Sequence, residues 1–136
     1  MKPYTHTVQY YETDKMGITH HSNYVRWMEE ARVDFLAQLG IPFAKLEADG
    51  IVSPVTAVEC KFKNVTTFSD VISIAVEVQE FTGIRLRIKY TMTKQDGTFI
   101  CECYSEHCFL HKDLTPIRLN KEFPEFYATI ISAIKK

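Results

Sequence analysis

Hydrophobic and polar positions repeat along the chain with two different periods, and the change of period divides it into elements. Residues 5–11 alternate and are rich in β-prone side chains, which predicts a first strand. The period of two returns later over four further segments, residues 55–62, 72–78, 84–90 and 99–110. One-sided alternation, with compact turns at Thr82-Gly83 and Asp96-Gly97, predicts that all five strands form an antiparallel sheet.

One segment between these strands has the helical period. Its apolar side chains recur every three or four residues, at Tyr24, Trp27, Met28, Ala31, Phe35 and Leu39. Ser22 or Asn23 can cap its start, Gly40 suits its end, and Pro42 prevents its continuation. The pattern predicts a long helix over residues 23–39.

The tail of the chain, residues 120–136, predicts a short second helix, with Lys135 and Lys136 where the helix dipole favours positive charge. The order strand, helix, four strands, helix is typical of one α+β domain over residues 1–136. Because the apolar face of the first helix is too wide to leave in water, the simplest packing wraps the sheet around it.

Charge and composition narrow the possible functions. Sixteen Lys and Arg against seventeen Asp and Glu give a net charge of -1, which argues against a dedicated nucleic-acid binder. No segment approaches the roughly 20 apolar residues of a membrane helix, and the polar start has no signal-peptide core. We therefore expect a cytoplasmic protein without membrane insertion, whose four cysteines are reduced thiols.

The densest chemistry lies in the turn between the first strand and the long helix. Residues 10–24 contain two carboxylates, two adjacent histidines, a glycine and several tyrosines. The free N–H groups and positive dipole of a helix start attract an anion or a developing oxyanion. Gly17 would let a substrate carbonyl approach the backbone closely. Spacing alone leaves open whether Asp14 has a chemical role or only caps the turn.

A specific motif covers this region: Tyr10-x-Glu12-Thr13-Asp14-x-Met16-Gly17-x-x-x-His21-x-Asn23-Tyr24, followed by Glu29-x-Ala31-Arg32. It resembles the signature of the 4-hydroxybenzoyl-CoA thioesterase-like hotdog family, in particular its bacterial acyl-CoA thioesterase branch. The element order resembles that family over nearly the whole chain. The resemblance implies a hotdog fold, in which a five-stranded antiparallel sheet wraps around a long central helix, plus a C-terminal helix. One departure is Ser69, which stands where the family has a glycine.

The resemblance implies an acyl-CoA thioesterase that releases a free acid and CoA. Asp14 matches the catalytic carboxylate, acting as nucleophile or as a base on water. His21 is the second expected catalytic residue, and its backbone N–H matches the oxyanion donor. Four residues are expected to bind substrate: Tyr10, Gly17, Tyr24 and Glu29. No cofactor is implied beyond the CoA that the substrate carries.

The resemblance also implies a homodimer or homotetramer, with the acyl-CoA site at the interface of two sheets joined edge to edge. Glu29 is expected to pair with Arg32 one turn further on. Two other functions stay open: an acyl-thioester hydratase or dehydratase of the same fold, and a non-catalytic acyl-thioester binding protein.

Three further groups of residues invite a functional interpretation. One group suggests zinc: Cys101, Cys103, His107, Cys108 and His111. Strand alternation, however, puts Cys108 on the opposite face from Cys101, Cys103 and His107, which favours buried thiols. His20 is expected either to face solvent or to lie behind the residues that contact the substrate. The basic residues are either a solvated sheet face or a handle for the CoA phosphates: Arg85, Arg87, Lys89, Lys61 and Lys63.

Overall fold

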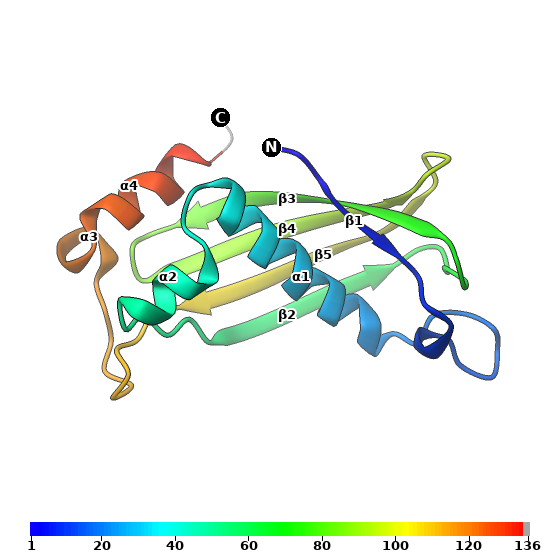
Figure 1. Cartoon of the computed structure of the whole chain (residues 1–136), viewed down its shortest axis with the longest axis horizontal. Coiled ribbons are helices and arrows are strands. Elements are labelled where there is room, and N and C mark those ends of the chain that lie inside the picture. Colours follow the sequence, from blue (N-terminus) through cyan, green and yellow to red (C-terminus); the bar gives the residue numbers. More distant parts are fainter. Residues whose placement is uncertain (135–136) are drawn as a thin grey trace.

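Five strands form one antiparallel sheet in this computed structural model, which describes residues 1–134. They are β1 (Tyr4–Thr7), β2 (Val55–Phe62), β3 (Val71–Phe81), β4 (Arg85–Lys94) and β5 (Phe99–Cys108). The order across the sheet is β1-β3-β4-β5-β2, so that β1 and β2 are its edges (Figure 1). The predicted five-stranded antiparallel sheet is confirmed, and its hairpins turn at the two expected glycines.

Helix α1 (Ser22–Gln38) lies across one face of this sheet (Figure 1). Its side chains Trp27, Met28 and Ala31 are almost completely buried against the sheet. On the sheet, the inward-facing residues of β3 and β4 form the other half of this layer, and they include Ile72, Ile74, Ile88, Tyr90 and Met92. This apolar layer fixes α1, and with it the position of the loop that precedes the helix.

Asn23, one of the two expected caps of α1, has a different role. The helix begins one residue earlier, at Ser22, whose N–H donates to His20 Nδ1 at 3.3 Å, and the N-cap residue His21 makes no side-chain capping bond. The Asn23 side chain turns back instead, and its Nδ2 donates to the carbonyl oxygens of Glu12 at 2.9 Å and His20 at 3.2 Å. Asn23 therefore ties the preceding loop to the helix.

The first strand is shorter than predicted. β1 ends at Thr7, and the expected strand residues 10 and 11 belong to a 3-10 helix, η1 (Tyr10–Glu12). The Glu12 N–H donates to the Gln9 carbonyl at 3.0 Å, while Glu12 Oε1 accepts the Gln9 N–H at 2.8 Å. This reciprocal pair closes a turn that β propensity alone does not reveal.

The helices beyond α1 also differ from the prediction. A short helix, α2 (Phe43–Ala48), follows Pro42 and buries Leu46. The single helix expected over residues 120–136 is wrong: α3 (Leu119–Glu122) and α4 (Pro124–Ser132) are separated at Phe123, because a proline disfavours helical backbone in the residue before it. Lys135 and Lys136 lie outside the described residues. Among residues 1–134, no helix is long and apolar enough to span a membrane.

Candidate active site

The Asp14 turn is held by its own backbone. The Asp14 N–H donates to the Ile18 carbonyl at 3.0 Å, and the Gly17 N–H donates to the Asp14 carbonyl at 2.9 Å. Asp14 Oδ1 accepts the Met16 N–H at 2.8 Å. Gly17 has a φ of 81°, and nothing lies within 4 Å of the place where a Cβ would stand. The turn therefore requires glycine for its left-handed backbone rather than for space.

The two oxygens of Asp14 have different surroundings. Oδ1 is fixed by the Met16 N–H, whereas no donor within residues 1–134 is bonded to Oδ2. The side chain is half-buried at the surface of the loop. One carboxylate oxygen is thus held in place while the other remains available to a substrate or to water.

Glu12, two residues earlier, is engaged on both oxygens. Oε1 lies 2.8 Å from His6 Nε2 and accepts the Gln9 N–H, while Oε2 accepts the Trp27 Nε1–H at 2.8 Å. The residue is only 5% exposed. Burial raises the pKa of this carboxyl, but the bonds from Gln9, His6 and Trp27 outweigh it and hold the pKa below its ordinary value. Glu12 anchors the loop to β1 and α1.

His21 stands at the start of α1 as its N-cap residue. Its backbone N–H has no acceptor in the described part of the chain, which leaves this donor free at the positive end of the helix. Its ring stacks on that of His20 with 4.4 Å between centroids. His20 faces solvent as predicted, with its Nδ1 2.9 Å from Ser22 Oγ.

A pocket of about 200 Å³ lies beside His21, and we call it the His21 pocket. It is lined by Ile18, Thr19, His21, Tyr24, Phe62, Lys63, Asn64 and Val65. Tyr24 is a buried wall whose hydroxyl lies 3.0 Å from Thr66 Oγ1. Tyr10 does not line this pocket; it is 76% exposed, with its ring edge-on to Phe68.

Glu29 belongs to a different pocket. This second pocket, of about 240 Å³, lies between α1, α2, α4 and the β2 side of the sheet, and we call it the Arg32 pocket. The predicted pair of Glu29 with Arg32 is wrong, because Arg32 Nη1 donates to the Tyr90 hydroxyl at 3.1 Å and residues 1–134 give it no carboxylate partner. Glu29 is exposed, eight residues and roughly 12 Å along the helix from His21.

The edge strand β2 leaves apolar side chains uncovered. Val55, Val58 and Phe62 point to the α1 side of the sheet, yet they are 47%, 44% and 49% exposed. Val33, which lines the Arg32 pocket together with Val55, continues this surface on α1 with 39% exposure. We call these four residues the β2 strip. An apolar strip along the free edge of a sheet is a typical interaction surface.

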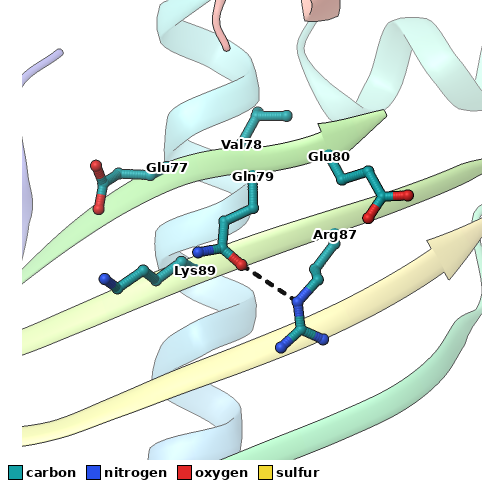
Figure 2. A pocket seen from close by; sticks show the side chains of 6 residues that line it. All are labelled: Glu77, Val78, Gln79, Glu80, Arg87 and Lys89. Atoms are coloured by element: carbon teal, nitrogen blue, oxygen red, sulfur yellow. Dashed lines mark hydrogen bonds between the residues drawn. The ribbon is translucent and has the colours of Figure 1, made fainter. Parts of the chain in front are cut away.

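The basic residues of the sheet mostly have acidic or polar partners on its outer face. Arg87 Nε donates to Gln79 Oε1 at 3.2 Å, and Lys89 projects beside it (Figure 2). Lys89 pairs with Glu102 at 3.0 Å, Arg85 pairs with Glu80 at 2.9 Å, and Lys61 pairs with Glu59 at 3.6 Å. Lys63 differs, since it lines the His21 pocket and has no carboxylate partner among residues 1–134.

The cysteines divide between the two faces as predicted. Cys101, Cys103 and His107 are buried on the α1 side, whereas Cys108 is partly exposed on the other. The bond to Cys101, together with burial, raises the pKa of the Cys103 thiol to about 12. Across residues 1–134, no three His, Cys, Asp or Glu residues are grouped so as to hold a metal ion.

Residues 8–131 match the thioesterase-like superfamily. The chain belongs to this superfamily. It is 33% identical over 107 residues to a putative esterase of Aquifex aeolicus, covering 79% of this chain and 83% of the relative. It is 28% identical over 129 residues to YneP, a putative acyl-CoA thioesterase of Bacillus subtilis, covering 94% of each.

A solved structure of a DHNA-CoA thioesterase from Staphylococcus aureus superposes with a TM-score of 0.92. It shares 30% sequence identity, and the match covers 96% of this chain and 89% of that one. The hotdog resemblance drawn from the motif is confirmed, and the chain is a member of a family of thioester hydrolases.

Sequence reasoning missed the parts of the site that depend on contacts between distant segments. It did not assign different roles to Glu12 and Asp14. The available signal was Trp27, a hydrogen-bond donor on the apolar face of the predicted helix, which bonds to Glu12. It also missed the hydrogen bond from Arg32 to the Tyr90 hydroxyl, which joins residues 58 positions apart.

Proposed function

We propose that the protein hydrolyses acyl-CoA thioesters and that Asp14 is the carboxylate that reacts. The observation that carries the proposal is the unequal bonding of this carboxylate, with Oδ1 held by the Met16 N–H and Oδ2 free. The unbonded N–H of His21 lies at the adjacent helix start, where negative charge on the thioester oxygen is favoured. A fixed carboxylate and an oxyanion donor are the two groups that acyl transfer needs, and both lie in the loop that leads into α1, although Asp14 is not among the residues that line the His21 pocket.

Two routes lead to the same products. In the first, Asp14 Oδ2 attacks the thioester carbon and expels the CoA thiolate, which takes a proton, and water then hydrolyses the mixed anhydride. In the second, Asp14 takes a proton from a water molecule that attacks the same carbon, and the tetrahedral intermediate then expels the CoA thiolate, which takes that proton. The His21 imidazole, on the wall of the His21 pocket, orients the thioester in both routes.

We further propose that the site is completed by a second copy of the chain. The His21 pocket lies at the Phe62 end of β2, and the Arg32 pocket lies at the Val55 end. Two copies that join their β2 edges about a two-fold axis pair these strands antiparallel. Each Phe62 end then lies beside the other copy's Val55 end, and the two β2 strips cover each other.

Lys63 is the basic residue that we assign to the CoA phosphates. Arg85, Lys89 and Lys61 have carboxylate partners on the outer sheet face, whereas Lys63 is unpaired within residues 1–134 and lines the His21 pocket. A free ammonium at the pocket rim can bind a phosphate as a point charge.

The activity is tested with a panel of short, long and aromatic acyl-CoA substrates and a dye that reacts with the released CoA thiol. We expect turnover of at least one class. Tight binding of several classes without CoA release would contradict hydrolysis and favour a binding protein. Conversion of an enoyl-CoA to a hydroxyacyl-CoA without CoA release would favour a hydratase.

The shared site is tested with Val58→Asp, which places a charge in the middle of the β2 strip. We expect this variant to sediment as a monomer and to lose turnover, because a buried unpaired carboxylate strongly destabilises an interface. Ile131→Asp, on α4 and 37% exposed, is the matched control and should behave as the unmodified protein. A fully active monomeric Val58→Asp variant would contradict the two-chain site.

A further inference from the structure

The backbone N–H groups of the segment that leads into α1 are bonded on both sides of His21. The bonded N–H groups belong to Thr19, His20, Ser22, Asn23 and Tyr24. Four of them donate to carbonyl oxygens, and that of Ser22 donates to His20 Nδ1. The His21 N–H, in the middle of this run, has no acceptor within residues 1–134. The fold thus leaves one donor open where its neighbours are satisfied.

Asn23 holds the peptide unit that carries this open donor. Its backbone N–H donates to the His20 carbonyl oxygen at 3.0 Å, and its Nδ2 donates to the same oxygen at 3.2 Å. Nδ2 also donates to the Glu12 carbonyl oxygen at 2.9 Å, so that both hydrogens of the amide are used. Asn23 is only 9% exposed, and water has little access to replace these bonds.

The His20 carbonyl and the His21 N–H belong to one trans peptide unit. Such a unit is planar, and its C=O and N–H point in opposite directions. The two bonds from Asn23 to the His20 oxygen therefore also fix the direction of the His21 N–H. Rotation of the unit would turn this N–H towards the Asn23 donors and would leave the His20 oxygen without them. A donor held in this way is preorganised, as the stabilisation of a transition-state charge requires.

Asparagine suits this position through its amide and not through its size alone. Aspartate has the same shape, but its carboxylate has no hydrogen to donate and would lie beside two carbonyl oxygens. In the first turn of a helix a carboxylate is otherwise favourable, because the positive end of the helix dipole attracts it. A role in starting α1 therefore tolerates Asn23→Asp, whereas a role in holding the peptide does not.

We propose that Asn23 is a positioning residue for the reaction, which directs the His21 N–H at the thioester oxygen of a bound substrate. Asn23 is not among the residues that line the His21 pocket, and it acts through the His20–His21 peptide instead of touching the substrate. This inference rests on the proposed thioesterase function, and it adds the residue that fixes the direction of the oxyanion donor.

The kinetic test compares Asn23→Asp and Asn23→Ala with the unmodified protein. We expect kcat to fall roughly ten- to a hundredfold in both, because the donor is misdirected, while the backbone bond from residue 23 to the His20 oxygen remains. KM should stay within about threefold, since the lost interaction forms only in the transition state. Asn23→Ala introduces no charge, and it serves as the second variant if Asn23→Asp does not fold.

Gln38→Glu is the matched control at the other end of the same helix. Gln38 Nε2 also uses both hydrogens, donating to the Lys2 carbonyl at 2.8 Å and to Asp34 Oδ2 at 2.7 Å. This variant should lose stability but keep its kcat. An unchanged kcat in folded Asn23→Asp and Asn23→Ala, or an equal fall of kcat in Gln38→Glu, would overturn the proposal.

The direction of the donor is measured independently of turnover, by infrared spectroscopy of a bound acyl-CoA analogue. The probe is a ketone with CH₂ in place of the thioester sulfur and a carbon-13 label in its carbonyl. We expect a lower carbonyl stretching frequency in the unmodified protein than in Asn23→Asp, because an aligned N–H weakens the C=O bond. Equal frequencies together with turnover of acyl-CoA would refute this inference alone. A frequency difference without turnover of any acyl-CoA would refute hydrolysis and support the directing role of Asn23.

Discussion

Glu12 and Asp14 are carboxylates two residues apart in one loop, yet the structure gives them opposite surroundings. Glu12 is buried and accepts bonds on both oxygens, from His6, Gln9 and Trp27. Asp14 lies in an open turn with one oxygen held by the Met16 N–H. The contrast supports the division of roles that we propose within this motif, in which Glu12 holds the loop in place and Asp14, with one oxygen unbonded, is the carboxylate that reacts.

His107 is a buried group whose titration affects stability. The pKa of His107 is lowered to about 4 by burial and by Arg32. Above pH 6.5 its ring is neutral in both states, but as the pH falls towards 4 only the unfolded chain takes the proton. We therefore expect the free energy of unfolding to fall by about 3 kcal/mol from pH 6.5 to pH 4 through this group. Urea unfolding of the unmodified protein and His107→Leu checks this; equal pH slopes would contradict it.

Glu12→Gln tests the anchoring role directly. In this variant the amide NH₂ would face one of the groups that now donate a hydrogen bond to the carboxylate, and that bond would be lost. We therefore expect a loss of roughly 1–3 kcal/mol in the free energy of unfolding. Since the folded pKa of Glu12 is lowered, its contribution is present above pH 4.5 and is lost as the pH falls through that folded pKa. Turnover per folded molecule should change only a few-fold. A stable but inactive Glu12→Gln variant would contradict the anchoring role of Glu12 and would assign the reaction to Glu12 instead of Asp14.

Gly17→Ala perturbs the Asp14 turn without filling any space. The left-handed backbone at φ 81° should make the substitution cost roughly 1–2 kcal/mol of stability. Gly97→Ala is the matched control, since Gly97 has a φ of 89° and nothing within 4 Å of an added Cβ. Thermal melting should show similar losses in both variants, whereas kcat should fall only in Gly17→Ala. If kcat fell equally in Gly17→Ala and Gly97→Ala, the claim that the Gly17 turn positions Asp14 for the reaction would be contradicted.

Lys63→Met should produce the smallest change. Removing an exposed ammonium from the rim of the His21 pocket should raise KM for acyl-CoA roughly two- to fivefold, in keeping with about 0.5–1 kcal/mol for an exposed charge contact. Lys61→Met, whose ammonium pairs with Glu59 on the outer face, serves as the control. The effect should weaken at high salt. If KM is unchanged in Lys63→Met, Lys63 does not bind the CoA phosphates.

The periodic parts of the chain could be predicted well from sequence, because local pattern and tertiary packing agree there. The helix Ser22–Gln38 differs from its predicted bounds by one residue at each end, and the β3, β4 and β5 hairpins turn where glycine allows. The prediction failed where one contact outweighs propensity. The Gln9–Glu12 pair ends the first strand early, and Pro124 divides the last helix.

The site could be predicted only as a set of residues, not as an arrangement. The motif singled out Asp14, Gly17 and His21, and the structure places all three in one loop at the start of α1. It does not bring Glu29 into that loop, because eight residues of helix separate it from His21. His107 was considered only as a metal ligand, although its spacing of two residues from Ser105 on β5 puts both side chains on one face and allows the bond between them.

The most direct test of the division of roles is the rate of CoA release in a single turnover by Asp14→Asn, with enzyme in excess over an acyl-CoA that the unmodified protein hydrolyses. Asparagine can still accept the Met16 N–H, so the turn should persist and the free energy of unfolding should stay within about 0.5 kcal/mol. Asp96→Asn is the matched control, because Asp96 Oδ1 accepts the Thr98 N–H at 2.9 Å in the same way. We predict that release slows roughly 10²- to 10⁴-fold in Asp14→Asn and is unchanged in Asp96→Asn. A folded Asp14→Asn protein that releases CoA at the unmodified rate would contradict the central role of Asp14.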